Sequence, residues 1–197
     1  MSANENRIST DFRRALRGFA ATVSIVSARD RAGNHGITVT AVSSVSMDPP
    51  SLLVVVNRSG GMHAALAEGE RFCINILGTE QVEHSRLFGK SMPMDERFEH
   101  GDWRLSADDV PYLNEAQANI FCRRVSQLDV GTHTVFVGTV YRLAIGDAIS
   151  PLIYLNGEYL GLDDEAGAGL VTASPPAAAA VRPSTSHPSL HHAHRRI

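Results

Sequence analysis

The chain contains little lysine, little cysteine and no long apolar run. Lysine occurs once among its 197 residues, at Lys90, and arginine supplies the other basic charges. No apolar run is longer than Leu52–Val56, whereas a membrane-spanning helix needs about 20 apolar residues. The N-terminus also lacks a basic segment that leads into an apolar one, so it shows no secretory signal. We therefore expect a cytoplasmic protein without a membrane segment.

The scarcity of cysteine excludes a disulfide framework and a cysteine-rich metal site. Cys73 and Cys122 lie far apart in strand-like segments, without a CxxC motif or a histidine at ligand spacing. We expect both to be reduced and buried as small apolar side chains. The four histidines between residues 187 and 194 have no carboxylate partners nearby in the sequence, so we predict no dedicated metal site there.

Several catalytic motifs are missing as well. The chain has no GxGxxG or Walker-type loop, which argues against dinucleotide binding on a doubly wound fold. It has no HExxH, no GxSxG and no spacing that pairs two carboxylates, so hydrolase chemistry has little support. All Asp and Glu residues lie within the first 165 residues and make that part mildly acidic. We therefore predict no nucleic-acid partner.

The chain does contain many short β-rich segments separated by turn residues. We predict strands over residues 22–28, 35–45, 51–57, 71–77, 116–126 and 132–144, and a hairpin of residues 152–155 and 158–162. Asn156-Gly157 favours the tight turn of that hairpin. Helices are predicted after the N-cap signal at residues 9–11 and over residues 62–68 and 79–88. This pattern indicates a mainly β, antiparallel barrel rather than alternating βαβ units.

Length and composition indicate one folded domain between a short N-terminal segment and a C-terminal tail. We assign residues 1–9 to a flexible N-terminus and residues 10–164 to the folded domain. Residues 165–197 are rich in alanine, proline, serine and histidine, and we predict a disordered tail. Residues 90–114 look irregular, and a loop of this length inside a domain is usually functional.

The segment from Gly36 to Pro50 is rich in hydroxyl groups and ends at two prolines. In an extended strand, side chains alternate between two faces, so residues 38, 40, 44 and 46 place hydroxyls on one face. Such a row suits a flat, polar ligand that carries phosphate. The solvated face of an antiparallel strand has the same pattern, and the pattern alone leaves both interpretations open.

The chain resembles the flavin reductase family in several separated blocks that occur in the family's order. The first is TxTAxSSxSxDPPSLLVxVN over residues 38–57, and the others are residues 72–77, 87–90, 94–98, 131–138 and 151–159. The resemblance covers about residues 10–162. It implies a Greek-key split β-barrel with a few short flanking helices, a homodimer, and reduction of flavin by reduced nicotinamide. The chain most resembles reductase components of two-component aromatic hydroxylases, such as that of 4-hydroxyphenylacetate 3-monooxygenase.

The resemblance also implies a flavin site built from two segments and one basic residue. Lys90 matches a position near the phosphate that varies within the family, and a solvated surface lysine would look the same. Arg97 and Phe98 fall in a matched loop block and are weaker candidates. The implied flavin contacts are Thr38, Thr40, Ala41, Val42, Ser43 and Ser44 in the first segment, Asn57, Arg58 and Ser59 in the second, and Lys90.

For the nicotinamide, the resemblance implies His133, in the Gly-Thr-His block, and Tyr159. A histidine at the start of a strand is also commonly a partly exposed structural residue. Tyr159 could equally pack in the core or at a dimer interface. No catalytic residue is essential in this reading, because hydride passes directly between the two cofactors and the protein supplies proximity and electrostatics.

The implied activity is an NAD(P)H-dependent flavin reductase that supplies reduced FMN or FAD to a separate monooxygenase. NADH and NADPH remain open, as do FMN and FAD. One alternative is a flavin-binding electron carrier or sensor that does not turn over nicotinamide. Another is a structural β-barrel module whose hydroxyl face is only solvated.

Overall fold

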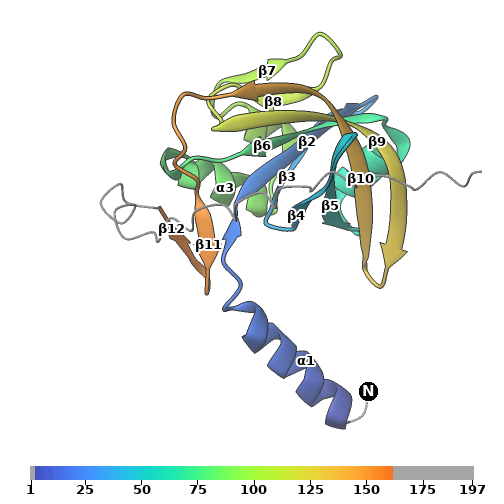
Figure 1. The fold of residues 1–197 in the computed structure, drawn as a ribbon, viewed down its shortest axis with the longest axis vertical. Helices are drawn as coiled ribbons and strands as arrows, with labels where there is room; N and C mark the ends of the chain where they lie inside the picture. Colours follow the sequence, from blue (N-terminus) through green and yellow to red (C-terminus); the bar gives the residue numbers. More distant parts are fainter. Residues whose placement is uncertain (1–2, 162–197) are drawn as a thin grey trace, which may run out of the picture.

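The computed structural model describes residues 3–161, which are mainly antiparallel β-structure (Figure 1). The predicted tail, residues 165–197, lies outside the described residues. The helices are α1 (Ala3–Leu16), α2 (Gly61–Glu68), α3 (Val82–Gly89) and α4 (Met94–Phe98), with one 3-10 turn at Thr79–Gln81. The strands are β1 (Ala21–Thr22), β2 (Ser24–Asp30), β3 (Gly33–Val39), β4 (Val42–Met47), β5 (Pro50–Asn57), β6 (Arg71–Ile76), β7 (Trp103–Leu105), β8 (Pro111–Leu113), β9 (Ala118–Val130), β10 (His133–Ile145), β11 (Ile153–Leu155) and β12 (Glu158–Leu160).

Seven strands form one antiparallel sheet in the order β3-β2-β6-β9-β10-β5-β4. Strands β3 and β4 follow each other in the chain, yet they lie at opposite edges of this sheet. Only Thr40 and Ala41 connect them, so the sheet must curl until its two edges approach. The result is a barrel that is split between these edges, and the prediction of a mainly β split barrel is confirmed.

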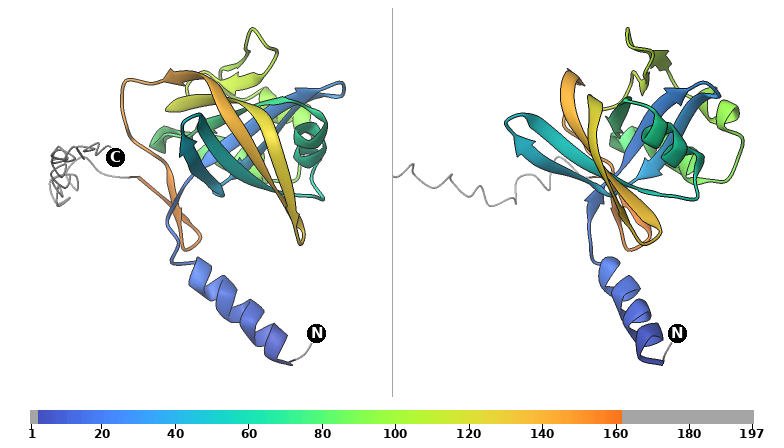
Figure 2. Two further views of the ribbon diagram at one scale, coloured as in Figure 1. Left: turned by 45° about the vertical axis from the view of Figure 1, so that its right-hand side comes forward. Right: turned by 90° about the vertical axis from the view of Figure 1, so that its right-hand side faces the viewer.

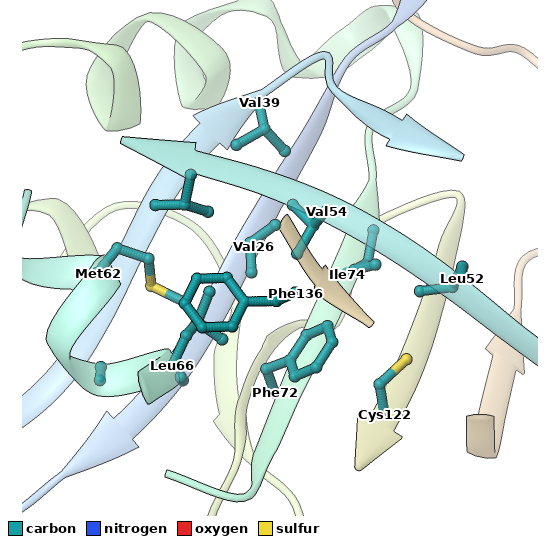
Figure 3. Packing of buried hydrophobic residues seen from close by; sticks show 13 residues of the cluster. Val26, Val39, Leu52, Val54, Met62, Leu66, Phe72, Ile74, Cys122 and Phe136 are labelled. Carbon is teal, nitrogen blue, oxygen red and sulfur yellow. The ribbon is translucent and has the colours of Figure 1, made fainter. Parts of the chain in front are cut away.

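The barrel interior is filled by side chains that alternate along the strands. In β5, Leu52, Val54 and Val56 are buried while their neighbours are partly exposed, as a strand with one face on the core requires. Helix α2 covers one end of the interior (Figure 3). There its Met62 and Leu66 pack in one cluster with ten strand residues and Ala65.

The hydroxyl-rich segment is not one continuous strand, and the predicted strand over residues 35–45 is therefore wrong. Strand β3 ends at Val39 because its partner is β2, whereas β4 starts at Val42 and pairs with β5. The chain changes neighbours at residues 40–41, and the expected common face of residues 38–46 is interrupted there. The sequence pattern cannot show this break, because both partners lie elsewhere in the chain.

Residues 90–114 are more ordered than predicted, since they contain α4 and the β7–β8 hairpin. The buried amide of Asn75 on β6 attaches this hairpin to the sheet: its Oδ1 accepts hydrogen bonds from Leu113 N at 2.8 Å and Asn119 Nδ2 at 2.9 Å. Its Nδ2 donates to Ile25 O at 2.8 Å. A distant buried amide therefore orders a segment that has little secondary-structure signal of its own.

Helix α1 begins at Ala3, well before the predicted cap at residues 9–11, so residues 3–9 lie in a helix. It stands away from the barrel, next to the small sheet of β1, β11 and β12 (Figures 1 and 2). Ile8, Phe12 and Leu16 recur at a spacing of four and form an exposed apolar stripe on it. Within residues 3–161, no helix is long and apolar enough to cross a membrane.

Candidate functional site

An open cleft of about 920 Å³ lies where the chain crosses from β3 to β4. All five residues from Thr40 to Ser44 line it. The structure therefore brings together most of the first predicted flavin segment. The other lining residues are Leu16, Phe19, Ala20, Ala21, Thr22, Ser24, Leu52, Leu53, Val55, Ile76, Ile120 and Tyr154.

Strand register places hydroxyls beside an apolar surface in this cleft. Ser43 pairs with Leu53, and Val55 N donates to Ala41 O at 3.0 Å. Directly opposite residues share a sheet face, so the β4 hydroxyl of Ser43 lies next to the apolar side chains of β5. This combination suits a ring system with one polar edge and one apolar end.

Within the described part of the chain, two hydroxyls of the first predicted flavin segment have no partner and line the cleft. Among the residues described, the Thr40 and Ser44 hydroxyls have no protein partner, whereas Ser43 Oγ donates weakly to Ser44 O at 3.3 Å. Strand β4 is also an edge strand, so its outward backbone N–H groups are not used by a neighbouring strand. The cleft wall therefore offers both side-chain and backbone hydrogen-bond donors.

Thr38 and Tyr159 meet beside the cleft rather than inside it. Thr38 Oγ1 donates to Ser85 O at 2.7 Å, and the Tyr159 hydroxyl lies 2.9 Å from Ser85 Oγ. These residues, with Thr40 and Tyr154, line a smaller pocket of about 160 Å³. Because the only hydrogen of the Thr38 hydroxyl is donated to a carbonyl, that hydroxyl can only accept from a ligand.

The second predicted flavin segment lies against the β9–β10 turn. Asn57 pairs with His133 across β5 and β10, and Arg58 N donates to Thr132 O at 3.0 Å. Asn57 Oδ1 accepts from both Ser59 N and Ser59 Oγ at 2.9 Å. The structure thus joins this segment to the predicted nicotinamide residue His133. None of these four residues lines the cleft. Asn57 lies two residues beyond Val55 at the end of β5, and Arg58 and Ser59 follow it.

The remaining candidates lie around the end of α3. Lys90 directly follows α3 and is exposed, outside the cleft lining. Phe98 packs in an aromatic cluster, with ring centroids 5.2 Å from Phe88 and 4.7 Å from Trp103. Phe98 is partly buried and packs against the core. Arg97 is buried, and its guanidinium contacts backbone carbonyls.

Within residues 3–161, the side chains that line the cleft are hydroxyl-bearing or apolar. The two thiols lie in the core instead: Cys73 and Cys122 are free and buried, as predicted. Burial raises the pKa of Cys122 to about 12 and raises that of Cys73 as well.

Sequence reasoning missed the contribution of the N-terminal segment and of Tyr154 to the cleft. Leu16 and Phe19 line it because the chain leaves α1 next to the crossover, which no local pattern indicates. Leu53 and Val55 could not be singled out in the sequence, because residues 52–56 are all apolar. The burial pattern of β5 and its pairing with β4 place them in the cleft.

The curled sheet and the cleft at its crossover define a split β-barrel with a candidate ligand site at the split. The sequence model of the Flavin reductase like domain matches residues 16–163, and this chain belongs to the flavin reductase family.

Relatives support the same assignment. The reductase component of an FADH(2)-dependent resorcinol hydroxylase from a Rhizobium species is 40% identical over 154 residues, covering 77% of this chain and 86% of the relative. An FMN reductase (NADH), RutF, from Variovorax paradoxus is 39% identical over 149 residues, covering 76% and 83%. The solved structure of the styrene monooxygenase flavin reductase from Pseudomonas putida has a TM-score of 0.71 and 32% identity, covering 78% of this chain and 97% of that one.

These matches confirm the predicted family, the split-barrel fold and the predicted class of flavin reductases. The names of the relatives also agree with flavin and NADH as the predicted cofactors and with a reductase component that serves a monooxygenase. The individual site residues stay predictions.

Proposed function

We propose that this protein uses NADH to reduce FMN or FAD and releases the reduced flavin to a separate monooxygenase. The observation that carries this proposal is the cleft, in which unpaired hydroxyls of Thr40 and Ser44 lie beside the apolar Leu53 and Val55. Family membership and the names of the relatives support the reaction class.

The residues of the chain bind and orient the two cofactors in this proposal. Bound flavin and reduced nicotinamide would supply the hydride transfer itself. The hydroxyls of Thr40 and Ser44 and the outward N–H groups of β4 would donate to the polar ring edge, and the Ser43 hydroxyl would accept from it. Leu53 and Val55 would cover the apolar end of the ring and exclude water from it.

The test is NADH oxidation by the purified protein, with flavin and nicotinamide varied independently and no monooxygenase present. We expect oxidation only when FMN or FAD is added, and a dependence on both substrates. Assays with NADPH in place of NADH, and with FMN and FAD in turn, measure which nicotinamide and which flavin the protein prefers. A protein that keeps its flavin but does not oxidise NADH in excess free flavin would be the electron carrier or sensor instead. Oxidation without flavin, or none at all, would contradict the proposal.

We propose further that two copies of the chain form a homodimer. The cleft residue Val55 pairs with Val135, and Val135 pairs with Leu128, so the apolar surface of the cleft continues across β10 to β9. Leu128 is 64% exposed and Phe12 on α1 is 61% exposed. Apolar surface of this kind supports an interface between subunits. Light scattering should give twice the chain mass of 21.2 kDa.

We place the protein in the cytoplasm, which the state of its two cysteines supports. Cys73 and Cys122 are both unpaired thiols within the described residues. Thiols persist where the compartment is reducing. Fractionation of the source cells, with the flavin-dependent NADH oxidation followed in each fraction, tests this location.

A further inference from the structure

A hydrogen-bonded network of three side chains connects α2 to the end of the β9–β10 hairpin. Nε2 of His63, on α2, lies 2.9 Å from Oγ1 of Thr134, on β10. Oγ1 of Thr134 donates to Oδ1 of Asp129, on β9, at 2.6 Å. Thr134 is fully buried, so its hydroxyl depends on these partners. Three elements of the fold therefore meet at one hydroxyl group.

The hydrogen bonds of this network have one direction. The Thr134 hydroxyl has a single hydrogen, and it donates that hydrogen to the carboxylate of Asp129. Oγ1 of Thr134 can therefore only accept from His63, so Nε2 of His63 must carry a hydrogen. The network thus fixes the tautomer of the neutral imidazole. It also orients the ring, which packs against Phe136 with the ring centroids 5.5 Å apart.

The carboxylate of Asp129 also connects the network to the β9–β10 turn. Oδ2 of Asp129 lies 3.7 Å from Nη1 of Arg58, whose Nη2 donates to Gly131 O at 2.5 Å. The backbone N of Arg58 donates to Thr132 O at 3.0 Å. Arg58 therefore holds the backbone of the turn, and Asp129 holds the side chain of Arg58. His133 follows this turn directly, so the network supports the position of His133.

His133 lies on the same sheet face as the apolar wall of the cleft. Side chains alternate between the two faces of a strand, and directly opposite residues share a face. On β5, Asn57 follows the cleft residue Val55 on the outward face, about 7 Å further along the strand. Asn57 is opposite His133, whereas the next residue, Thr134, is buried on the core face. The network therefore lies behind the point where His133 extends the cleft face.

We propose that His63 and Asp129 are positioning residues of the nicotinamide site, which act through Thr134 to hold His133 on the cleft face. The proposal rests on the proposed function and on the predicted contact between His133 and the nicotinamide. His63 and Asp129 themselves touch neither cofactor. Without the Thr134 hydroxyl, each of them would lose a hydrogen bond, and the turn before His133 would lose its connection to α2.

Two substitutions of Thr134 separate the role of its hydroxyl from that of its packing. Thr134→Val removes the hydroxyl and keeps the branched shape, whereas Thr134→Ser keeps the hydroxyl and removes a methyl group. In steady-state NADH oxidation at saturating flavin, we expect Thr134→Val to raise the KM for NADH about fivefold. Thr134→Ser should leave this KM unchanged. The flavin dissociation constant, measured by fluorescence, should be unchanged in both variants.

Removal of the carboxylate should have the same effect as removal of the hydroxyl. We expect Asp129→Ala to raise the KM for NADH about as much as Thr134→Val does. Asp108→Ala is the matched control, because Asp108 forms an ion pair with Arg71 at the same distance of 3.7 Å, outside the network. It should change neither the KM for NADH nor the flavin dissociation constant.

The combination with His133→Ala tests the route of the effect. If the network acts only through His133, the addition of Thr134→Val to His133→Ala should raise the KM no further. Imidazole ¹⁵N spectra of the unmodified protein give a second readout. Neutral His63 must carry its hydrogen on Nε2, and NAD⁺ added with FMN must shift the His63 and His133 resonances with the same dissociation constant.

Equal KM values for NADH in Thr134→Val and Thr134→Ser would overturn the proposal, because the hydroxyl would then support only the fold. Additive effects of Thr134→Val and His133→Ala would also overturn it. If Thr134→Val does not fold, the spectra decide: a hydrogen on Nδ1 of neutral His63, or no response of His63 to saturating NAD⁺, would overturn the proposal. The absence of NADH oxidation by the unmodified protein would instead contradict the proposed function.

Discussion

Asn57 lies directly opposite His133 across the β5–β10 ladder. One belongs to a predicted flavin segment and the other is the predicted nicotinamide residue, although 75 residues separate them in the sequence. His133 is exposed, and its Nδ1 lies 2.9 Å from Thr132 Oγ1. Within the described residues, Nε2 of His133 has no hydrogen-bond partner, so this atom is available to a ligand.

We therefore expect His133→Ala to raise the KM for NADH about fivefold, which is the loss of one hydrogen bond of about 1 kcal/mol. The KM for flavin should stay unchanged. Steady-state NADH oxidation at saturating flavin measures both. His100→Ala, which removes an exposed histidine after α4, is the matched control. An unchanged KM and turnover for NADH would show that His133 has only a structural role.

The cleft hydroxyls should bind flavin individually. Thr40→Val and Ser44→Ala are each expected to raise the flavin dissociation constant about three- to tenfold, because each removes one hydrogen-bonding group from the cleft wall. Fluorescence titration measures binding, and circular dichroism should show an unchanged fold. Ser46→Ala is the control, since Ser46 Oγ donates to Asp48 O and Ser46 does not line the cleft. Equal binding by all three variants would contradict the hydroxyl assignment.

Tyr159 and Tyr154 allow a matched comparison of two hydroxyls. The Tyr159 hydroxyl is hydrogen-bonded to the buried Ser85, whereas among the described residues the Tyr154 hydroxyl has no partner. Tyr159→Phe should lower the free energy of unfolding by about 1 kcal/mol, and Tyr154→Phe should leave it nearly unchanged. Urea unfolding measures both. A change in the KM for NADH in Tyr159→Phe would in addition place this tyrosine at the nicotinamide.

The buried thiols should resist alkylation in the native protein. With a pKa of about 12, roughly one Cys122 side chain in ten thousand is a thiolate at pH 8, and the thiolate is the reactive form. Neither cysteine should react with iodoacetamide at pH 8, whereas both should react in denaturing urea. Mass spectrometry counts the adducts. Rapid labelling of the folded protein would show that the core opens or that one thiol is exposed.

Local signals account for much of the fold. The uninterrupted apolar run of residues 52–56 predicted a buried strand, and in β5 Leu52, Val54 and Val56 face the core. Asn156-Gly157 predicted the β11–β12 turn, where both residues have positive φ, of 52° and 92°. Such features depend on neighbouring residues alone, so a single sequence can show them. The separated family blocks then added a predicted flavin site to these local signals.

The arrangement of the site depends on contacts between distant residues. The break at Thr40–Ala41 arises because β3 and β4 pair with strands at opposite edges of the sheet. Leu16 and Phe19 reach the cleft through the path of the chain after α1, and Arg97 meets Gly36 only through the packing of α3 and α4 on β3.

The sequence by itself therefore determined the β-rich class, the family and the hydroxyl-bearing segment, because composition, alternation and motif order are properties of the chain. Tertiary structure decided which hydroxyls line the cleft. It placed Thr40, Ser43 and Ser44 in the cleft wall and committed the hydroxyl hydrogen of Thr38 to Ser85. The physical reason is that hydrogen-bond partners and burial are set by strand pairing and helix packing between residues far apart in sequence.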